Sequence, residues 1–125
     1  MTSGELEILR TVLDKWKSAV DAHDPKRVAS YFTDDAIFQG LHSYSIGPEG
    51  VSGYYEAQPI GMTASYDIRE TRRLGDDLIL GYLTVDFAFT DRPVLEVNLS
   101  VIVRRISNVW LITHYQVSRL GLPDA

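Results

Sequence analysis

Cysteine is absent from the chain, and histidine is scarce. Without cysteine the protein has no disulfide, no thiolate nucleophile and no cysteine-ligated metal. The three histidines, His23, His42 and His114, fall in different predicted elements, and they form neither an i, i+4 pair nor a His-x-Glu motif. The sequence therefore offers no set of metal ligands, and we expect no bound metal.

Signatures of phosphate binding and of nucleophilic catalysis are missing as well. No glycine-rich loop follows a predicted strand, and no serine lies in a strand-to-helix elbow. We therefore expect no nucleotide cofactor and no Ser-His-Asp triad.

Long apolar runs and an excess of positive charge are also lacking. No apolar stretch reaches ~18 residues, so we expect no membrane-spanning segment. The acidic N-terminus lacks the apolar run of a signal peptide, which predicts a cytoplasmic protein. A net charge of −5 argues against a nucleic-acid or anionic-membrane partner.

What the chain does contain is the composition of an ordinary globular domain. It has 125 residues, of which 45% are hydrophobic and 23% are charged. Because domains typically hold roughly 100–150 residues, residues 1–125 are predicted to form one domain with one core.

Apolar spacing predicts three helices and five strands. Apolar residues recur every three or four positions across residues 5–23, which indicates an amphipathic helix. Asp24-Pro25 begins a second helix, with Tyr31 and Phe32 on its apolar face, and Gly47-Pro48 begins a third, since Pro suits the first helical turn. A short strand is predicted at residues 36–40, between these two helices. Long strands are predicted at residues 63–74 and 78–90 and in a hairpin at 94–118.

This order of elements is typical of an α+β fold. Long antiparallel strands in a small domain must twist and curl. We therefore predict a cone-shaped α+β barrel, in which three N-terminal helices pack on a curved antiparallel sheet of four long strands plus one short strand. Such a cone has an open mouth and an apolar interior.

The hairpin at residues 94–118 supplies much of the predicted inner surface. Its first arm carries an alternating apolar row of Leu95, Val97, Leu99, Val101 and Val103. Beyond a turn at Ser107-Asn108, the same period-two spacing places Trp110, Ile112, His114, Gln116 and Ser118 on one face. A polar pair, His114 with Gln116, is thus predicted at one end of an apolar sheet face.

The segment AVDAHDPKRVASYFTDDAIF and the ending WLITHYQVS resemble the nuclear transport factor 2-like superfamily, which includes ketosteroid isomerase and the SnoaL-like polyketide cyclases. The phrases FQGLHSY, GYYEAQPIGM and HYQVSRL are most similar to the SgcJ/EcaC family of antibiotic-biosynthesis proteins, which occurs among polyketide and enediyne genes. The resemblance covers nearly the whole chain. It implies the cone fold and a pocket for a polyketide or polyene-like molecule.

Three positions separate the chain from the ketosteroid isomerases that it resembles. Trp16 stands where the isomerases have a catalytic tyrosine, and Gly40 stands where they have a proton-shuttling aspartate. Leu99 or Val101 stands where they have a second, protonated aspartate. An indole N–H donates a hydrogen bond but is not an acid of comparable strength. Steroid isomerisation by that route is therefore excluded.

If the protein is an enzyme, His114 and Gln116 are the candidate catalytic residues. On one strand face they would place a general base beside a group that orients a carbonyl or a hydroxyl. The alternative is that both side chains satisfy each other, or backbone groups at the rim of the cone. His42, near the position of the isomerases' aspartate, is an alternative base, although an exposed loop histidine is the commoner outcome.

The predicted ligand-binding residues are the apolar and aromatic side chains that should face into the cone. The superfamily has a pocket-lining aromatic residue where this chain has Tyr54 and Tyr55, so the resemblance implies that one of the two lines the pocket. The complete predicted set is Trp16, Tyr31, Phe32, Phe38, Tyr54, Tyr55, Met62, Leu83, Val85, Phe87, Leu99, Val101 and Ile112. The alternative for each is ordinary core packing.

Two functions remain open from the sequence. In the first, the cone binds a small hydrophobic ligand and assists a cofactor-independent cyclisation, isomerisation or dehydration. The SgcJ/EcaC family is often labelled oxidoreductase, but this sequence contains no nicotinamide or flavin motif that would support that label. In the second, the chain is a non-catalytic homodimeric association domain. Its dimer contact would be the convex sheet face, where Asp86, Glu96, Asn98 and Ser100 are predicted to lie.

Overall fold

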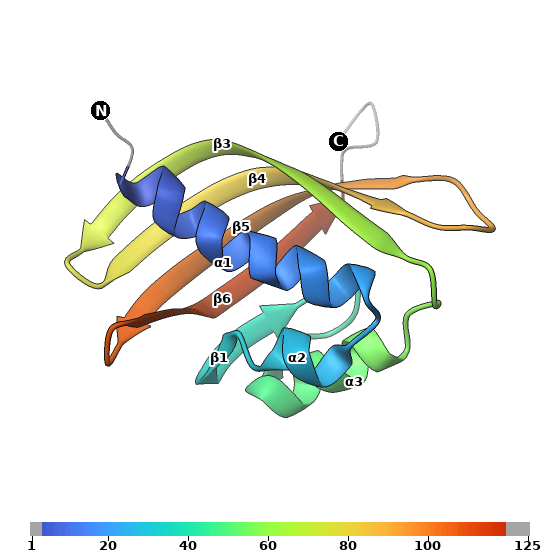
Figure 1. The fold of residues 1–125 in the computed structure, drawn as a ribbon, viewed down its shortest axis with the longest axis horizontal. Helices are drawn as coiled ribbons and strands as arrows, with labels where there is room; N and C mark the ends of the chain where they lie inside the picture. The colour runs from blue at the N-terminus through green and yellow to red at the C-terminus, as the bar shows by residue number, and fades with distance from the viewer. Residues whose placement is uncertain (1–3, 120–125) are drawn as a thin grey trace.

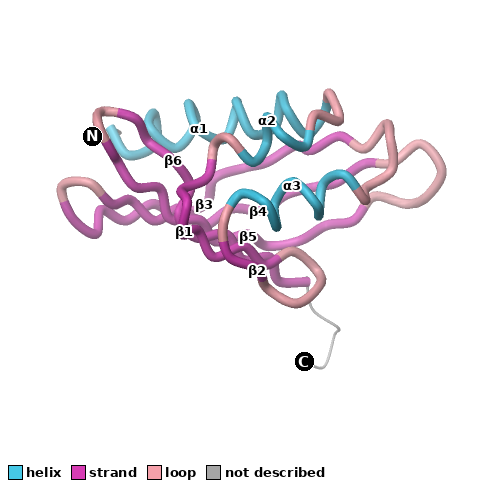
Figure 2. The backbone as a smooth tube through the Cα atoms, turned by 90° about the horizontal axis from the view of Figure 1, so that it is seen from below, coloured by secondary structure: helices cyan, strands magenta, loops and turns pink. Residues whose placement is uncertain are grey.

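The computed structural model of the protein describes residues 4–119. Within them, three helices lie on one side of a curved six-stranded sheet, which confirms the predicted α+β architecture (Figures 1 and 2). The helices are α1 (Gly4–Asp21), α2 (Pro25–Ala29) and α3 (Pro48–Glu56). The strands are β1 (Phe32–Gln39), β2 (Ser45–Ile46), β3 (Thr63–Gly75), β4 (Leu78–Ala88), β5 (Leu95–Ile106) and β6 (Val109–Arg119).

The strand order is β2-β1-β6-β5-β4-β3. Strands β3 to β6 form the predicted antiparallel meander, whereas β1 runs parallel to β6. The sequence prediction missed β2 and began β1 four residues late, because it counted Tyr31 and Phe32 as part of the second helix. Helix α2 ends at Ala29, and Phe32 is already the first residue of β1.

Helix α1 packs its apolar stripe against the concave face of the sheet. The buried residues of that stripe are Leu9, Val12, Leu13, Trp16, Ala19 and Val20. The helix comes close to β4 at Gly81, where an added Cβ would lie 3.1 Å from the Leu9 side chain. At the C-terminal end, Asp21 accepts a hydrogen bond from the backbone N–H of Ala64, and Lys17 donates one to the carbonyl oxygen of Ala64. These bonds hold α1 over β3.

The predicted inner row of β5 is confirmed from Val97 to Val103. Alternating residues of β4 are buried under the helices in the same way, as period-two spacing requires. The turn between β5 and β6 falls at Ser107 and Asn108, which have φ of 49° and 66°. Two consecutive left-handed residues are typical of a type I′ hairpin turn, and Asn tolerates that conformation well.

A β-bulge interrupts β6 at Thr113. Val103 of β5 pairs with Ile112, but the preceding residue Ile102 pairs with His114. Two residues of β6, Thr113 and His114, therefore oppose a single residue of β5. An extra residue of this kind reverses the inward and outward alternation of the strand beyond it.

The bulge decides which residues at the end of β6 face the interior. Tyr115 and Val117 are buried, while Gln116 and Ser118 are exposed. The prediction that His114, Gln116 and Ser118 share the inner face with the start of the strand is therefore wrong. It assumed an uninterrupted period of two across a strand that contains one additional residue.

Candidate functional site

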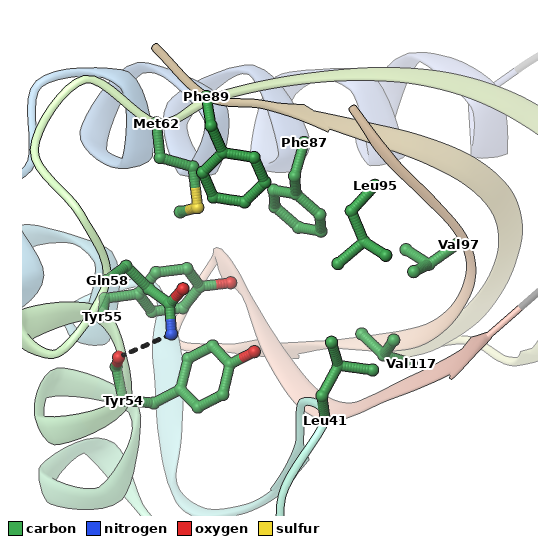
Figure 3. A pocket seen from close by; sticks show the side chains of 10 residues that line it. All are labelled: Leu41, Tyr54, Tyr55, Gln58, Met62, Phe87, Phe89, Leu95, Val97 and Val117. Atoms are coloured by element: carbon green, nitrogen blue, oxygen red, sulfur yellow. Dashed lines mark hydrogen bonds between the residues drawn. The ribbon is translucent and has the colours of Figure 1, made fainter. Parts of the chain in front are cut away.

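A pocket opens between α3 and one end of β4, β5 and β6 (Figure 3). It encloses about 340 Å³ of free space, part of which is open to solvent. The cavity volume proper is about 40 Å³. The wall residues are Leu41, Tyr54, Tyr55, Gln58, Met62, Phe87, Phe89, Leu95, Val97 and Val117.

Only three wall residues, Tyr54, Tyr55 and Gln58, have polar side chains. The Gln58 amide nitrogen donates to the carbonyl oxygen of Tyr54 at 3.3 Å, which ties that amide to the end of α3. Within residues 4–119, the wall contains no carboxylate, histidine, lysine or arginine. The pocket therefore offers hydrogen bonds and apolar contact, but no charge.

Tyr55 belongs to a buried cluster with Trp16 and Tyr115, which we call the tyrosine–tryptophan cluster. The indole N–H of Trp16 donates to the Tyr55 hydroxyl at 3.2 Å, and the hydroxyls of Tyr55 and Tyr115 lie 2.9 Å apart. All three side chains are buried. The cluster joins α1, α3 and β6 and fixes the Tyr55 hydroxyl beside the pocket.

Aromatic rings fill most of the space that a hollow cone would leave open. The Phe38 ring stacks on Tyr115 with centroids 4.6 Å apart, and it contacts Tyr54 edge to face at 5.1 Å. Trp16 packs at 6.2 Å from both Tyr115 and Phe87. Because these rings contact one another, they fill the middle of the cone, and the pocket between α3 and the strands lies at one end of it.

Tyr54 occupies the space that a side chain at position 40 would need. A Cβ built on Gly40 would lie 2.4 Å from Cζ of Tyr54 and 2.6 Å from its hydroxyl oxygen. Any residue other than glycine would push the Tyr54 ring out of its place. The position at which the isomerases have an aspartate is thus filled by a phenol from α3.

The tyrosine hydroxyls near the pocket are poor acids in this environment. Burial raises the pKa of Tyr55, and its hydrogen bonds with Tyr115 and Trp16 offset part of that effect. Burial likewise raises the pKa of Tyr54, with a partial offset from the backbone of Leu41. Burial also raises the pKa of Tyr115. These hydroxyls are therefore neutral hydrogen-bond donors at physiological pH and not bases.

Of the thirteen predicted ligand-binding residues, Tyr54, Tyr55, Met62 and Phe87 lie in the wall. The other nine pack in the core or against it: Trp16, Tyr31, Phe32, Phe38, Leu83, Val85, Leu99, Val101 and Ile112. The prediction assigned every inward-facing side chain in this set to the wall of the pocket. Most of them contact other core residues instead.

The predicted catalytic pair lies outside this pocket. His114 is half-buried on the outer face of the sheet, between its register partners Ile37 and Ile102. Gln116 is exposed on the same face. The bulge at Thr113 is the physical reason. His42 is exposed, and although its ring centroid is 6.0 Å from that of Tyr54, it is not part of the wall.

Six wall residues were absent from the prediction: Leu41, Gln58, Phe89, Leu95, Val97 and Val117. Leu95 and Val97 already belonged to the predicted inward row at residues 95–103, so the signal for them was available, and Phe89 follows the last residue of β4. Val117 and Tyr115, which share the inner face of β6, were missed because of the bulge at Thr113. No residue pattern in β6 indicates that bulge. Leu41 and Gln58 lie outside regular elements, where periodicity carries no information.

Two further properties bound the chemistry of the described chain. Within residues 4–119, no group of three or more His, Asp or Glu side chains is placed to hold a metal ion. The same residues include no helix that is both long and apolar enough to cross a membrane.

The fold defines the class of protein. The chain superimposes on an NTF-2-like protein of unknown function from Shewanella oneidensis with a TM-score of 0.78 and 14% identity, covering 90% of this chain and 98% of that one. A candidate calcium/calmodulin-dependent protein kinase II association domain from Xanthomonas campestris gives 0.83 at 19% identity, covering 98% and 91%. A ketosteroid isomerase-like protein from Erwinia carotovora gives 0.76 at 16% identity, covering 97% and 100%. The cone is therefore the nuclear transport factor 2-like fold.

The family follows from the sequence match. The model of the SnoaL-like domain matches residues 9–123, so the chain belongs to the SnoaL-like family. No curated protein sequence matches the chain significantly.

Proposed function

We propose that the protein binds a small hydrophobic molecule in the pocket between α3 and the ends of β4 to β6. The supporting observation is the composition of the wall, in which seven of ten residues are apolar and the other three are uncharged. Transfer of apolar ligand surface from water into such a wall contributes about 25 cal/mol per Å². Apolar walls with a few placed polar groups are typical of small-molecule sites.

The ligand class is a polyketide or polyene-like intermediate of secondary metabolism. The resemblance of FQGLHSY and HYQVSRL to the SgcJ/EcaC family supports this class. The narrow pocket suits one ring or one chain segment, with the remainder of a longer molecule in the open mouth.

Any assistance to a cyclisation, isomerisation or dehydration would come from holding the ligand in shape. No wall residue exchanges a proton near neutral pH, because Tyr54 and Tyr55 have raised pKa values and the Gln58 amide does not titrate. Hydrogen bonds from the two phenols are the chemical means that the pocket offers.

Filling the pocket is expected to abolish binding. Leu41→Trp enlarges a wall residue that is 37% exposed, so the variant should fold normally. We expect its Kd for hydrophobic aromatic and polyene compounds, measured by calorimetry, to rise at least about tenfold. Leu74→Trp is the matched control, because Leu74 is exposed on β3 away from the wall. Equal affinities in the two variants, or no binding to the wild type, would contradict the proposal.

A second candidate function is association of two copies through the outer face of the sheet. Residues in register across five strands form a row, which we call the outer stripe, that is apolar except for His114: Ile46, Ile37, His114, Ile102 and Leu80. Ile37 and Ile46 are 43% and 56% exposed. An exposed apolar row rimmed by polar side chains is typical of an interaction surface.

Charges on the same face favour a second copy as the partner. Asp86 and Glu96 lie directly opposite each other on β4 and β5, an arrangement that is destabilising for like charges. Within residues 4–119, neither carboxylate takes part in a salt bridge. Arg104 is at the other end of the same face of β5. A two-fold axis between these ends would bring Arg104 of each copy to the acidic pair of the other.

A charge placed in the outer stripe is expected to separate the two copies. The wild type should have the mass of a dimer in light scattering, and Ile102→Glu should have that of a monomer, because an unpaired carboxylate would be buried at the contact. Val109→Glu, at the exposed hairpin tip, is the control that should remain a dimer. A monomeric wild type would rule out this second function and leave the pocket proposal untouched.

A further inference from the structure

The tyrosine–tryptophan cluster has more donor hydrogens than hydrogen bonds. Trp16, Tyr55 and Tyr115 bring one N–H and two O–H groups, but only two hydrogen bonds join them. An indole N–H cannot accept, whereas each hydroxyl can donate one hydrogen bond and accept two. One hydroxyl hydrogen of the cluster is therefore left without an acceptor inside it.

Burial decides whether Tyr55 or Tyr115 has the hydroxyl hydrogen that lacks an acceptor inside the cluster. If Tyr55 donated to Tyr115, the Tyr115 hydrogen would have no acceptor in a side chain that is 1% exposed and lies outside the pocket wall. An unpaired buried hydroxyl hydrogen is costly. If Tyr115 donates instead, Tyr55 accepts from both Trp16 and Tyr115, and its own hydrogen is free at the pocket wall. In the second arrangement, the one hydrogen without an acceptor in the cluster is at the pocket wall, where a ligand can accept it.

The two incoming bonds determine what Tyr55 can recognise. Both acceptor positions of its oxygen are taken, so toward the pocket it can only donate. Hydrogen bonds in a chain polarise one another, so the two incoming bonds strengthen this donor. The Tyr54 hydroxyl, whose ring is 5.2 Å from that of Tyr55, points into the same space (Figure 3). The apolar pocket thus presents two phenol donors and no cation.

We infer that the ligand carries a neutral acceptor oxygen, such as the carbonyl of a ketone, quinone or ester, and that Tyr55 donates to it. This inference rests on the proposed binding function and adds the ligand's polar end to it. A carbonyl oxygen has two lone pairs and can accept from both phenols. An anionic end is disfavoured, because no wall residue is cationic and an unpaired charge is expensive in an apolar site.

A matched pair of probes tests the inference. Acetophenone and cumene have the same number of non-hydrogen atoms and nearly the same size, and their main difference is a carbonyl oxygen in place of a methyl group. Titrations followed by NMR should show that the wild type binds the ketone roughly five- to tenfold more tightly, the effect of one neutral hydrogen bond. Ketone binding should also move the indole N–H resonance of Trp16, which donates to Tyr55, while that of Trp110 stays in place.

Two variants separate the donor from the residue that orients it. Tyr55→Phe should remove the part of the ketone preference that the Tyr55 donor supplies, leaving at most the contribution of the Tyr54 hydroxyl, and it should leave cumene binding unchanged. Tyr115→Phe should weaken the preference without removing it, because the Tyr55 hydrogen remains. A stronger preference in Tyr115→Phe would mean that Tyr55 had been donating to Tyr115, which overturns the inference.

The outcomes also distinguish this inference from the proposed function. Equal affinity of the wild type for ketone and hydrocarbon would overturn the inference and leave hydrophobic binding intact. Failure of both probes to bind would overturn the binding function and the inference with it.

Discussion

Replacing Trp16 by alanine is expected to lower the free energy of unfolding by about 3–5 kcal/mol. The indole is fully buried, packs edge to face on Phe87 and donates to the Tyr55 hydroxyl. Truncation leaves a cavity under α1 and removes one of the bonds that orient Tyr55. Because small domains are stable by only about 5–15 kcal/mol, this single change removes a large fraction of the total. Urea unfolding followed by circular dichroism measures the loss.

Two companion variants show where the loss arises. Trp16→Phe keeps an aromatic ring and removes the N–H donor, so we expect a smaller loss of about 1–2 kcal/mol. Trp110→Ala is the matched control, since Trp110 is half-buried and contacts Arg105 with its ring face. It should cost about 1 kcal/mol. If Trp16→Ala and Trp110→Ala lowered the free energy of unfolding equally, the expectation that buried Trp16 contributes more to stability than Trp110 would be wrong.

The regular elements could be predicted because burial of one face imposes a period on the sequence. Helix α1 and strands β3 to β6 lie within two residues of their predicted bounds at nearly every end. Residues such as Val97 and Leu83 alternate with polar neighbours, and that alternation reports which side is buried. Where an element is too short to show a period, as in β2, the sequence carried no signal.

The bulge at Thr113 could not be predicted from the same kind of pattern. The run Trp110 to Ser118 alternates equally well in either register, since His114, Tyr115 and Gln116 are all tolerated on a half-exposed strand. Pairing with β5 on one side and β1 on the other decides the matter, and both partners are distant in sequence. Because the prediction assumed an uninterrupted period of two, it placed His114 and Gln116 on the wrong face of the sheet and missed Tyr115 on the inner face.

The sequence predicted a wider cavity than the folded chain contains, and only four of the thirteen predicted wall residues line it. The sequence pattern of an inward-facing aromatic side chain is the same whether that side chain lines a cavity or fills it. In the folded chain, the stack of Phe38 on Tyr115 and the Tyr54 ring over Gly40 take up volume inside the cone. The glycine at position 40 is therefore a steric requirement of the Tyr54 ring of α3.

Raising the pH above about 10 is expected to lower the free energy of unfolding steeply. Burial raises the pKa of Tyr55 and of Tyr115 above the value of an unfolded tyrosine. Below that unfolded pKa both states are protonated, and the tyrosines cause no pH dependence. Above it, the unfolded state ionises while the folded state does not. Stability should then fall by about 1.4 kcal/mol per pH unit for each of the two tyrosines until the folded pKa is reached.

Two such groups together give a slope of about 2.7 kcal/mol per pH unit, which exhausts the stability of a typical domain within a few units. Urea midpoints measured from about pH 8 to about pH 11 give the slope, and phenolate absorbance should rise together with unfolding. The double variant Tyr55→Phe with Tyr115→Phe should be less stable at the lower pH, because it loses the buried hydroxyl bonds, yet it should lose less stability as the pH rises. Tyr44→Phe is the control, since Tyr44 is 64% exposed. If the double variant and the wild type lose stability with equal slopes, the buried hydroxyl pair is not what couples this fold to pH.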